Sequence, residues 1–257
     1  MTDKNVEIIH TEEWQIEMLR LTAFQIPPSS VSNPEWWKIV TGEEPEIVSS
    51  RLKEGTHAEE GPFCNGKLVN QIKPNRIDWL LTSGREQKDL GSMVVGPFSE
   101  TLKAFLSLMS KWLGSATCPT VYRLAFGAVL LLPVGSLSAG YKKLVPLLPS
   151  VELKTEKASD FMYQINRPRN SHSGVPGMEI NRLSKWSVAT TFGVGFWFSP
   201  KGVETTHREE EQFACRLEID INTRPSEYQP LPKEKSNTLL EELAELGKEI
   251  ATKGDIP

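Results

Sequence analysis

The chain has 257 residues, of which 39% are hydrophobic and 24% are charged, as is typical of a folded globular protein. Its formal net charge is −4, which disfavours nucleic acid as a partner, because dedicated duplex binders are usually clearly basic. The three cysteines lie far apart, which disfavours a disulfide framework or a Cys-x-x-Cys metal clamp. Residues 1–11 are polar, and the longest apolar run is about half the length of a membrane span. We therefore expect a cytoplasmic protein that does not enter a membrane.

The first elements are a strand and short helices. Residues 14–24 alternate and then lose phase, which predicts a strand that is bulged or buried on both faces. The pair Trp36-Trp37 follows a proline and predicts a short helix. Pro45 at a first-turn position predicts a second helix over residues 44–52.

A hairpin and an amphipathic helix come next. Residues 68–72 and 77–81 are strand-like and flank residues 73–76, whose Pro-Asn pair favours a turn. Residues 84–96 are predicted to form a loop. Residues 97–113 carry an apolar stripe at helical spacing, which predicts an amphipathic helix.

The second half repeats these kinds of element. The pattern predicts a strand over residues 121–134, followed by a helix over residues 137–148 that a proline shortens. A strand over residues 160–165, a polar loop over residues 166–177 and a longer strand over residues 178–192 are predicted next. Residues 193–198 either extend the last strand or turn back on it. Residues 213–221 alternate strictly, which indicates an antiparallel sheet covered on one side. A final helix is predicted to start at a capping box formed by Thr238 and Glu241.

This order predicts an α+β fold, in which long amphipathic helices pack on one face of an antiparallel sheet. The two halves, residues 1–117 and 118–257, follow a similar order and are expected to share one core, as two units or as a single domain. A short echo between residues 70–76 and 163–169 favours a duplication, and convergent strand composition explains it equally well.

Motifs of the common catalytic sites are missing. The chain has no phosphate-binding loop, no GxGxxG, HExxH, GxSxG or CxxC, and its four histidines lie far apart. We therefore predict no cofactor, no metal site and no catalytic residue, and we lean against an enzyme.

Two sets of residues are candidates for binding. Trp36 and Trp37 are about 100° apart on a helix, and an exposed tryptophan favours a partner-binding surface; burial of both at a sheet end is the alternative. The second set consists of basic or polar residues of two turns, for which ordinary solvated turns are the alternative. It predicts a rim that binds phosphate or acidic groups and comprises Lys73, Arg76, Arg167, Arg169 and His172.

Two pairs of charged residues have the composition of a metal or nuclease site. Glu218 and Asp220 project from one face of a strand and are able to share a divalent cation. Glu152 and Lys154 match half of a carboxylate–lysine nuclease motif. The alternative for the first pair is the solvated face of a half-buried strand, and for the second a charged strand edge.

The NRIDW hairpin (residues 75–79) and the LEIDIN strand (residues 217–222) resemble a family of uncharacterised bacterial proteins of about this length. The resemblance implies an accessory protein of bacterial origin and supplies no catalytic residue. In outline the fold is also similar to helix-grip ligand carriers and to sheet-and-helix export chaperones, although a fold does not fix a function.

The leading hypothesis is a non-enzymatic interaction protein with an accessory, antitoxin-like, chaperone-like or phage-defence role. Its partner is then another protein or a further copy of itself in a homo-oligomer. One alternative is a carrier that holds an apolar small molecule in a helix-grip-like cavity walled by Trp79, Trp186 and Trp197. The others are a metal-dependent nuclease that uses Glu218 and Asp220, and an RNA-binding protein that uses the two basic turns.

Overall fold

The computed structural model describes residues 13–25, 35–85, 89–155, 158–191, 194–199, 202–208, 211–224 and 229–257, with 194–199 and 202–208 as backbone only. The described strands and helices are, in chain order, β1 (Gln15–Phe24), α1 (Trp36–Thr41), β2 (Ile47–Arg51), β3 (Thr56–Phe63), β4 (Gly66–Lys73), β5 (Arg76–Thr82), α2 (Leu90–Met93), β6 (Gly96–Pro97), α3 (Phe98–Gly114), β7 (Arg123–Val134), α4 (Leu137–Leu144), the 3-10 helix η2 (Val145–Leu147), β8 (Met162–Asn166), β9 (Arg169–Asn170), β10 (Glu179–Thr191), β11 (Val194–Ser199), β12 (Gly202–Arg208), β13 (Gln212–Arg224), the 3-10 helix η3 (Lys233–Lys235) and α5 (Ser236–Lys253).

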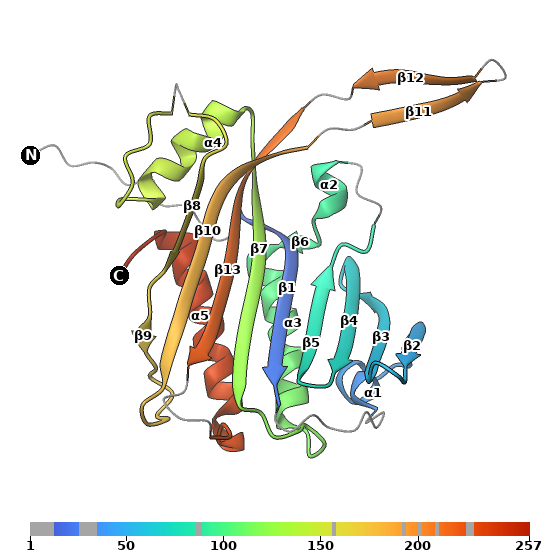
Figure 1. The fold of residues 1–257 in the computed structure, drawn as a ribbon, viewed down its shortest axis with the longest axis vertical. Coiled ribbons are helices and arrows are strands. Elements are labelled where there is room, and N and C mark those ends of the chain that lie inside the picture. Colours follow the sequence, from blue (N-terminus) through green and yellow to red (C-terminus); the bar gives the residue numbers. More distant parts are fainter. Residues whose placement is uncertain are drawn as a thin grey trace, which may run out of the picture.

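One antiparallel sheet of 11 strands organises the molecule (Figure 1). Its main path runs β2-β3-β4-β5-β1-β7-β13-β10-β8, with β6 beside β1 and β9 beside β10. The strands β11 and β12 form a separate two-stranded sheet. The predicted mixture of helices and strands and the antiparallel sheet are therefore confirmed. The described helices are few, and among them only α3, with 17 residues, and α5, with 18, exceed eight residues.

The centre of the sheet is the pair β1 and β7. The strand β1 also pairs with β5, the last strand of the first half, and β7 pairs with β13, the last strand of the main sheet in the second half. One sheet is thus continuous from the first half (residues 1–117) to the second half (residues 118–257). The echo segments lie in β4–β5 and in β8–β9, which stand at different distances from the centre.

The helices α3 and α5 cover one face of the sheet and contact each other; Figure 1 shows both behind the strands. Their apolar stripes are buried against β1, β7, β13 and β10. Trp14 Nε1, at the start of the described chain, donates a hydrogen bond to the carbonyl of Ala251 in α5, at 2.9 Å. The core therefore joins segments from both ends of the sequence.

Several predicted elements are confirmed in detail. The strand β1 has a register shift between Ile16 and Met18 that fits the predicted bulge. The hairpin of β4 and β5 turns where Pro74 and Asn75 stand. Proline 146 ends α4 early, and the chain continues as the short η2.

Three predictions are wrong. Residues 84–96 are predicted to form a loop but contain the short helix α2. Residues 44–52 contain the strand β2 in place of a helix, because Ile47 to Arg51 pair with β3, and tertiary pairing overrides the local signal of a proline. The capping box is also wrong. The helix α5 starts at Ser236, with no side-chain hydrogen bond at its N-cap, so Thr238 lies inside the helix.

Candidate functional site: the exposed edge strand

The strand β2 forms one edge of the main sheet, at the lower right of Figure 1. Among the described strands it pairs only with β3. Within the described residues, one side of its backbone therefore presents N–H and C=O groups without a strand partner, which is an arrangement that can pair with another chain. All five of its residues are exposed.

Exposed apolar side chains gather at this edge. In the described part of the chain six large hydrophobic side chains are exposed, and four of them lie in α1, in β2 or directly after it: Ile39, Ile47, Val48 and Leu52. Ile47 and Val48 are each 54% exposed and point to opposite faces of the strand. We call Ile47, Val48, Leu52 and the unpaired backbone of β2 the β2 edge.

A buried polar cluster lies next to the β2 edge. The hydroxyl of Ser50 is 2.7 Å from His57 Nδ1, and His57 Nε2 is 3.4 Å from Glu59 Oε1. The side chains of His57 and Glu59 are buried. This set has the composition of a Ser-His-Glu relay, but an imidazole buried in this way is not accessible to a substrate. We therefore assign the cluster a structural role at the base of the edge.

Asn70 extends this cluster toward the tryptophans. It pairs with Glu59 on one side and with Trp79 on the other in the sheet register. It is 0% exposed, and within the described part of the chain neither its amide nitrogen nor its oxygen has a hydrogen-bond partner. The indole N–H groups of Trp37 and Trp79 are also buried and likewise have no hydrogen-bond partner among the described residues.

We expect Asn70→Leu to raise the free energy of unfolding by about 1 kcal/mol, because it removes a buried amide that has lost its hydrogen bonds with water. The measurement is urea denaturation at neutral pH. The matched control is Asn181→Leu, since the side chain of Asn181 hydrogen-bonds Asn166 and Asn222 at 3.1 and 2.9 Å; this variant should lose stability. A loss of stability in Asn70→Leu would show that its amide has a partner in solution.

The two tryptophans predicted for binding are in the core. Trp36 and Trp37 are 6% and 2% exposed, as the alternative of joint burial expected. Trp37 stacks on Trp79, with ring centroids 6.3 Å apart, and Trp36 and Trp79 each meet Trp112 edge to face. Such aromatic pairs stabilise the core beyond their buried area. Neither indole of the pair lies on the surface to meet a partner.

The two basic turns are not neighbours. The strands β1, β7, β13 and β10 stand between β5 and β8, so the turns are about 24 Å apart, at about 4.8 Å a strand. In the first turn, Arg76 Nε lies 2.9 Å and Lys73 Nζ 3.9 Å from Asp78 Oδ2. The predicted rim is therefore not assembled as one site, and its first part is already paired with a carboxylate.

The second basic turn is held by carboxylates that lie in α5 and directly after it. Arg167 forms a bidentate ion pair with Asp255, in which Nη2 lies 2.8 Å from Oδ2. Arg169 Nη1 lies 2.8 Å from Glu249 Oε2. The backbone N–H of His172 donates to Glu242 at 2.6 Å. These contacts fasten α5 to the β8–β10 side of the sheet.

Electrostatics of the same region follow from these pairs. The hydrogen bond from Arg167 lowers the pKa of Asp255, against the opposing effect of burial. Burial raises the pKa of Glu249, but its bonds to Arg169 outweigh this and lower the pKa overall. Burial and the nearby Arg169 lower the pKa of the buried Arg182.

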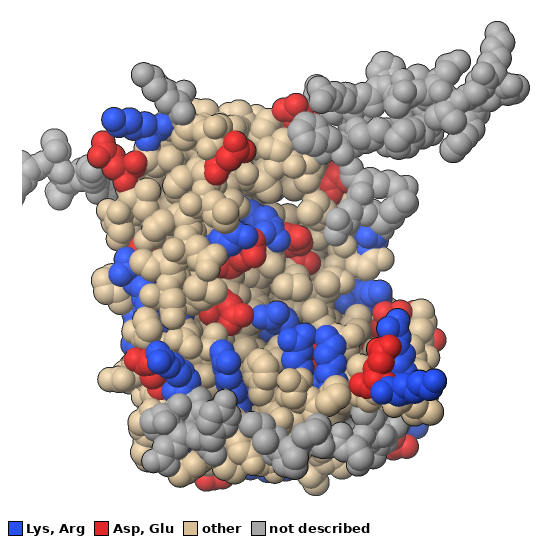
Figure 2. Space-filling model, in the orientation of Figure 1, with Lys and Arg blue, Asp and Glu red and all other residues tan. Residues whose placement is uncertain are grey.

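The two carboxylates proposed for a metal site lie on the open face of the sheet, where Figure 2 shows acidic and basic side chains interspersed. Glu218 pairs with Arg216 and with Lys185, the latter at 3.0 Å. Asp220 lies 3.0 Å from Arg20. Among the described residues no group of three or more metal-ligating side chains is placed to hold an ion.

The other candidates are also dispersed. Glu152 and Lys154 lie outside any strand, so the expected strand edge is absent at that position. Trp79 and Trp186 are fully buried in different halves, where Trp79 meets Trp37 and Trp112 and Trp186 meets Trp14. The side chain of Trp197 lies outside the described residues. The first two tryptophans therefore do not face one cavity.

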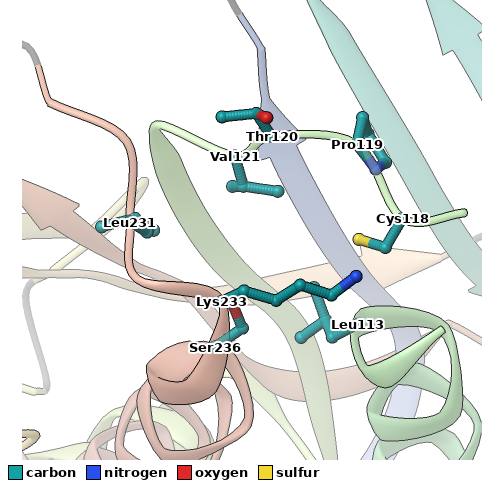
Figure 3. A pocket seen from close by; sticks show the side chains of 8 residues that line it. All are labelled: Leu113, Cys118, Pro119, Thr120, Val121, Leu231, Lys233 and Ser236. Carbon is teal, nitrogen blue, oxygen red and sulfur yellow. The ribbon is translucent and has the colours of Figure 1, made fainter. Parts of the chain in front are cut away.

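A small pocket lies where α3 ends and α5 begins (Figure 3). Its volume is about 240 Å³, and its wall includes Leu113, Cys118 and Lys233. Lys233 Nζ donates a hydrogen bond to the carbonyl of Ser115 at 2.8 Å. Burial raises the pKa of the Cys118 thiol to about 11 although Lys233 opposes the shift. The thiol is therefore protonated at neutral pH and is a poor nucleophile.

Comparison of the chain with protein-family models, with curated proteins and with solved structures gives no match. Within the described residues, no helix has both the length and the apolar character that crossing a membrane requires.

Sequence reasoning missed the β2 edge, because the proline before it was interpreted as the start of a helix. A signal was present in the adjacent β-branched residues Ile47 and Val48, which favour a strand. The following Gly55 has φ +62° and closes the turn into β3.

Proposed function

We propose that this protein is a non-enzymatic interaction protein that binds another polypeptide by adding a strand to the β2 edge. The observation that supports the proposal is an unpaired edge strand that exposes apolar side chains on both of its faces. Strand addition uses main-chain hydrogen bonds for affinity and alternate side chains for specificity. An accessory, antitoxin-like, chaperone-like or phage-defence role is compatible with such binding.

The alternative explanation for β2 is an edge that the fold protects from pairing. Protected edges are short and carry charged or inward-pointing side chains and proline. The strand β2 is short, and Pro45 precedes it, but Ile47 and Val48 expose about half of each side chain. Isolated exposed apolar residues are ordinary, whereas a cluster of them at an open edge marks an interaction site.

The open sheet face is less suited to this role. Its charged side chains already pair with one another: Arg20 with Asp220, and Arg216 with Glu17 and Glu218. A partner that covered them would have to desolvate these pairs. The β2 edge offers backbone groups and apolar side chains without that cost.

We expect Val48→Lys to abolish the complex that the protein forms in its host, because it places a charge where apolar surface is buried. The measurement is native mass spectrometry of the protein after gentle purification from its own host. The matched control is Val145→Lys, at an exposed valine of η2, which should keep the complex. Both variants should match the wild-type stability to within about 0.5 kcal/mol.

The proposal fails if the wild-type protein has the mass of a bare monomer, or if Val48→Lys retains the complex as well as the control does. A monomer with a few hundred daltons of additional mass would support the small-molecule carrier in its place.

A further inference from the structure

The sequence around β2 changes sign along its length. Glu43, Glu44 and Glu46 precede the strand, whereas Arg51 and Lys53 lie at its end and just beyond it, followed by Glu54, so that the second segment keeps a net positive charge. Two parallel copies would bring like charges together. Two antiparallel copies would place the acidic segment of one beside the basic segment of the other, and symmetry would repeat the match.

We propose that the polypeptide that adds to the β2 edge is a second copy of this chain, whose own β2 pairs antiparallel with the first across a two-fold axis. The inference rests on the proposed function and names the partner. It joins the main sheets of two molecules edge to edge.

The centre of β2 suits a two-fold axis. A two-fold axis at Ser49 would place the small hydroxyl side chain of Ser49 opposite its own copy, and Ser50 opposite Val48 of the other copy. Ile47, Val48 and Leu52 would then lie on either side of the axis, where they are shielded by the opposite strand. A contact of this kind is self-complementary, because when one residue of the first copy meets a second residue of the other copy, the symmetry repeats the same contact with the copies exchanged.

The charges that would pair across the axis are only loosely held in one molecule. Lys38 contacts Glu44, and Arg51 contacts Glu54 at 3.4 Å, and all four side chains are more than half exposed. Exposed pairs of this kind contribute about 0–1 kcal/mol. They can therefore change partners on association at little energetic cost, and charge complementarity then selects the antiparallel arrangement.

The test exchanges the two charged segments. Variant A is Arg51→Glu with Lys53→Glu, which makes both flanks acidic, and variant B is Glu43→Lys with Glu46→Lys, which makes the flanks predominantly basic. Sedimentation velocity at low salt should show a dimer for the wild type and monomers for A and B, with the dimer dissociation constant raised at least about 100-fold. An equimolar mixture of A and B should form a heterodimer.

The heterodimer is the decisive result, because two misfolded variants would not recover assembly on mixing. A second measurement uses Ser49→Cys in a background where the exposed Cys64 is serine. Opposite residues of antiparallel strands have Cα atoms about 4.5–5.5 Å apart, within the range for a disulfide. Mild oxidation should therefore link two copies through residue 49.

Any one of the following sedimentation results would overturn the inference: a monomeric wild-type protein at about 100 µM, dimers that persist in both A and B, or a mixture of A and B that stays monomeric. A monomeric wild type would leave the proposed function intact if a different protein is lost from the host complex on Val48→Lys. A dimer that persists in Val48→Lys as well would overturn the inference and remove the support that self-association gives the proposed function.

Discussion

Replacing Gly254 with alanine should lower the free energy of unfolding by about 3–5 kcal/mol. Gly254 follows α5 with φ +78° and ψ −150°, a backbone region open almost only to glycine, where other residues cost about 1–3 kcal/mol. An added Cβ would also lie 2.1 Å from the carbonyl oxygen of Leu147, and such overpacking costs about 1–3 kcal/mol more. Urea denaturation followed by tryptophan fluorescence measures the loss.

Gly42→Ala is the matched control for this change. Gly42 ends α1 with φ +83°, and an added Cβ there would meet no atom within 4 Å. Gly42→Ala should therefore lower the free energy of unfolding by only about 1–2 kcal/mol, which is the cost of a left-handed backbone for a residue other than glycine. Equal losses in the two variants would show that the contact between Gly254 and Leu147 has no energetic weight.

Removing the carboxylate beside Gly254 should have the second large effect. We expect Asp255→Ala to lose about 3 kcal/mol at neutral pH, a value typical of breaking a buried ion pair. The carboxylate of Asp255 is buried, pairs with Arg167 and accepts a hydrogen bond from the hydroxyl of Tyr163 at 2.7 Å. Without it, the partly buried guanidinium of Arg167 would face the end of α5 unpaired.

The effect of Asp255→Ala should depend on pH with a defined sign. The pKa of Asp255 is lowered in the folded state, whereas an unfolded aspartate titrates near pH 3.9. The carboxylate therefore stabilises the fold above about pH 4 and loses this contribution as the pH falls through its folded pKa. The difference between wild type and variant should be constant from about pH 6 to 8 and should shrink below about pH 4.

Glu245→Ala serves as the control for the pH series. Glu245 lies on the exposed side of α5 and contacts only Lys248 among the described ion pairs, one turn away. Its removal should change stability by less than about 0.5 kcal/mol. A difference for Asp255→Ala that does not change down to pH 2 would contradict the assigned ion pair.

Much of the sheet could be predicted because its strands carry strong local patterns. Residues 213–221 alternate, and β13 buries one face as expected. The helix α3 was predicted within one residue at each end, because its apolar stripe repeats at helical spacing over four turns. The hairpin of β4 and β5 followed from the Pro-Asn turn. In each of these cases the information lies within about 20 neighbouring residues.

The remaining features depend on residues that are distant in sequence. The strand β2 forms because β3 pairs with it, and its five residues are too few to carry a strong pattern of their own. The basic turn at Arg167 appeared free because its partner Asp255 is 88 residues away. The burial of Trp36 and Trp37 follows from a cluster with Trp79 and Trp112. Such pairings carry little local signal, so sequence reasoning selected residues other than those of the β2 edge for the candidate site.

The position of β1 has a consequence for synthesis of the chain. The strand β1 pairs with β5 and with β7, and β7 begins at Arg123. During translation the backbone edge of β1 that pairs with β7 therefore stays unpaired until more than 100 further residues have left the ribosome. Pairing between strands that are distant in sequence slows folding, and the unpaired strand edges are prone to aggregation in the meantime. We expect nascent chains that stop before residue 123 to aggregate or to bind chaperones, whereas chains that include β13 and α5 should fold on release.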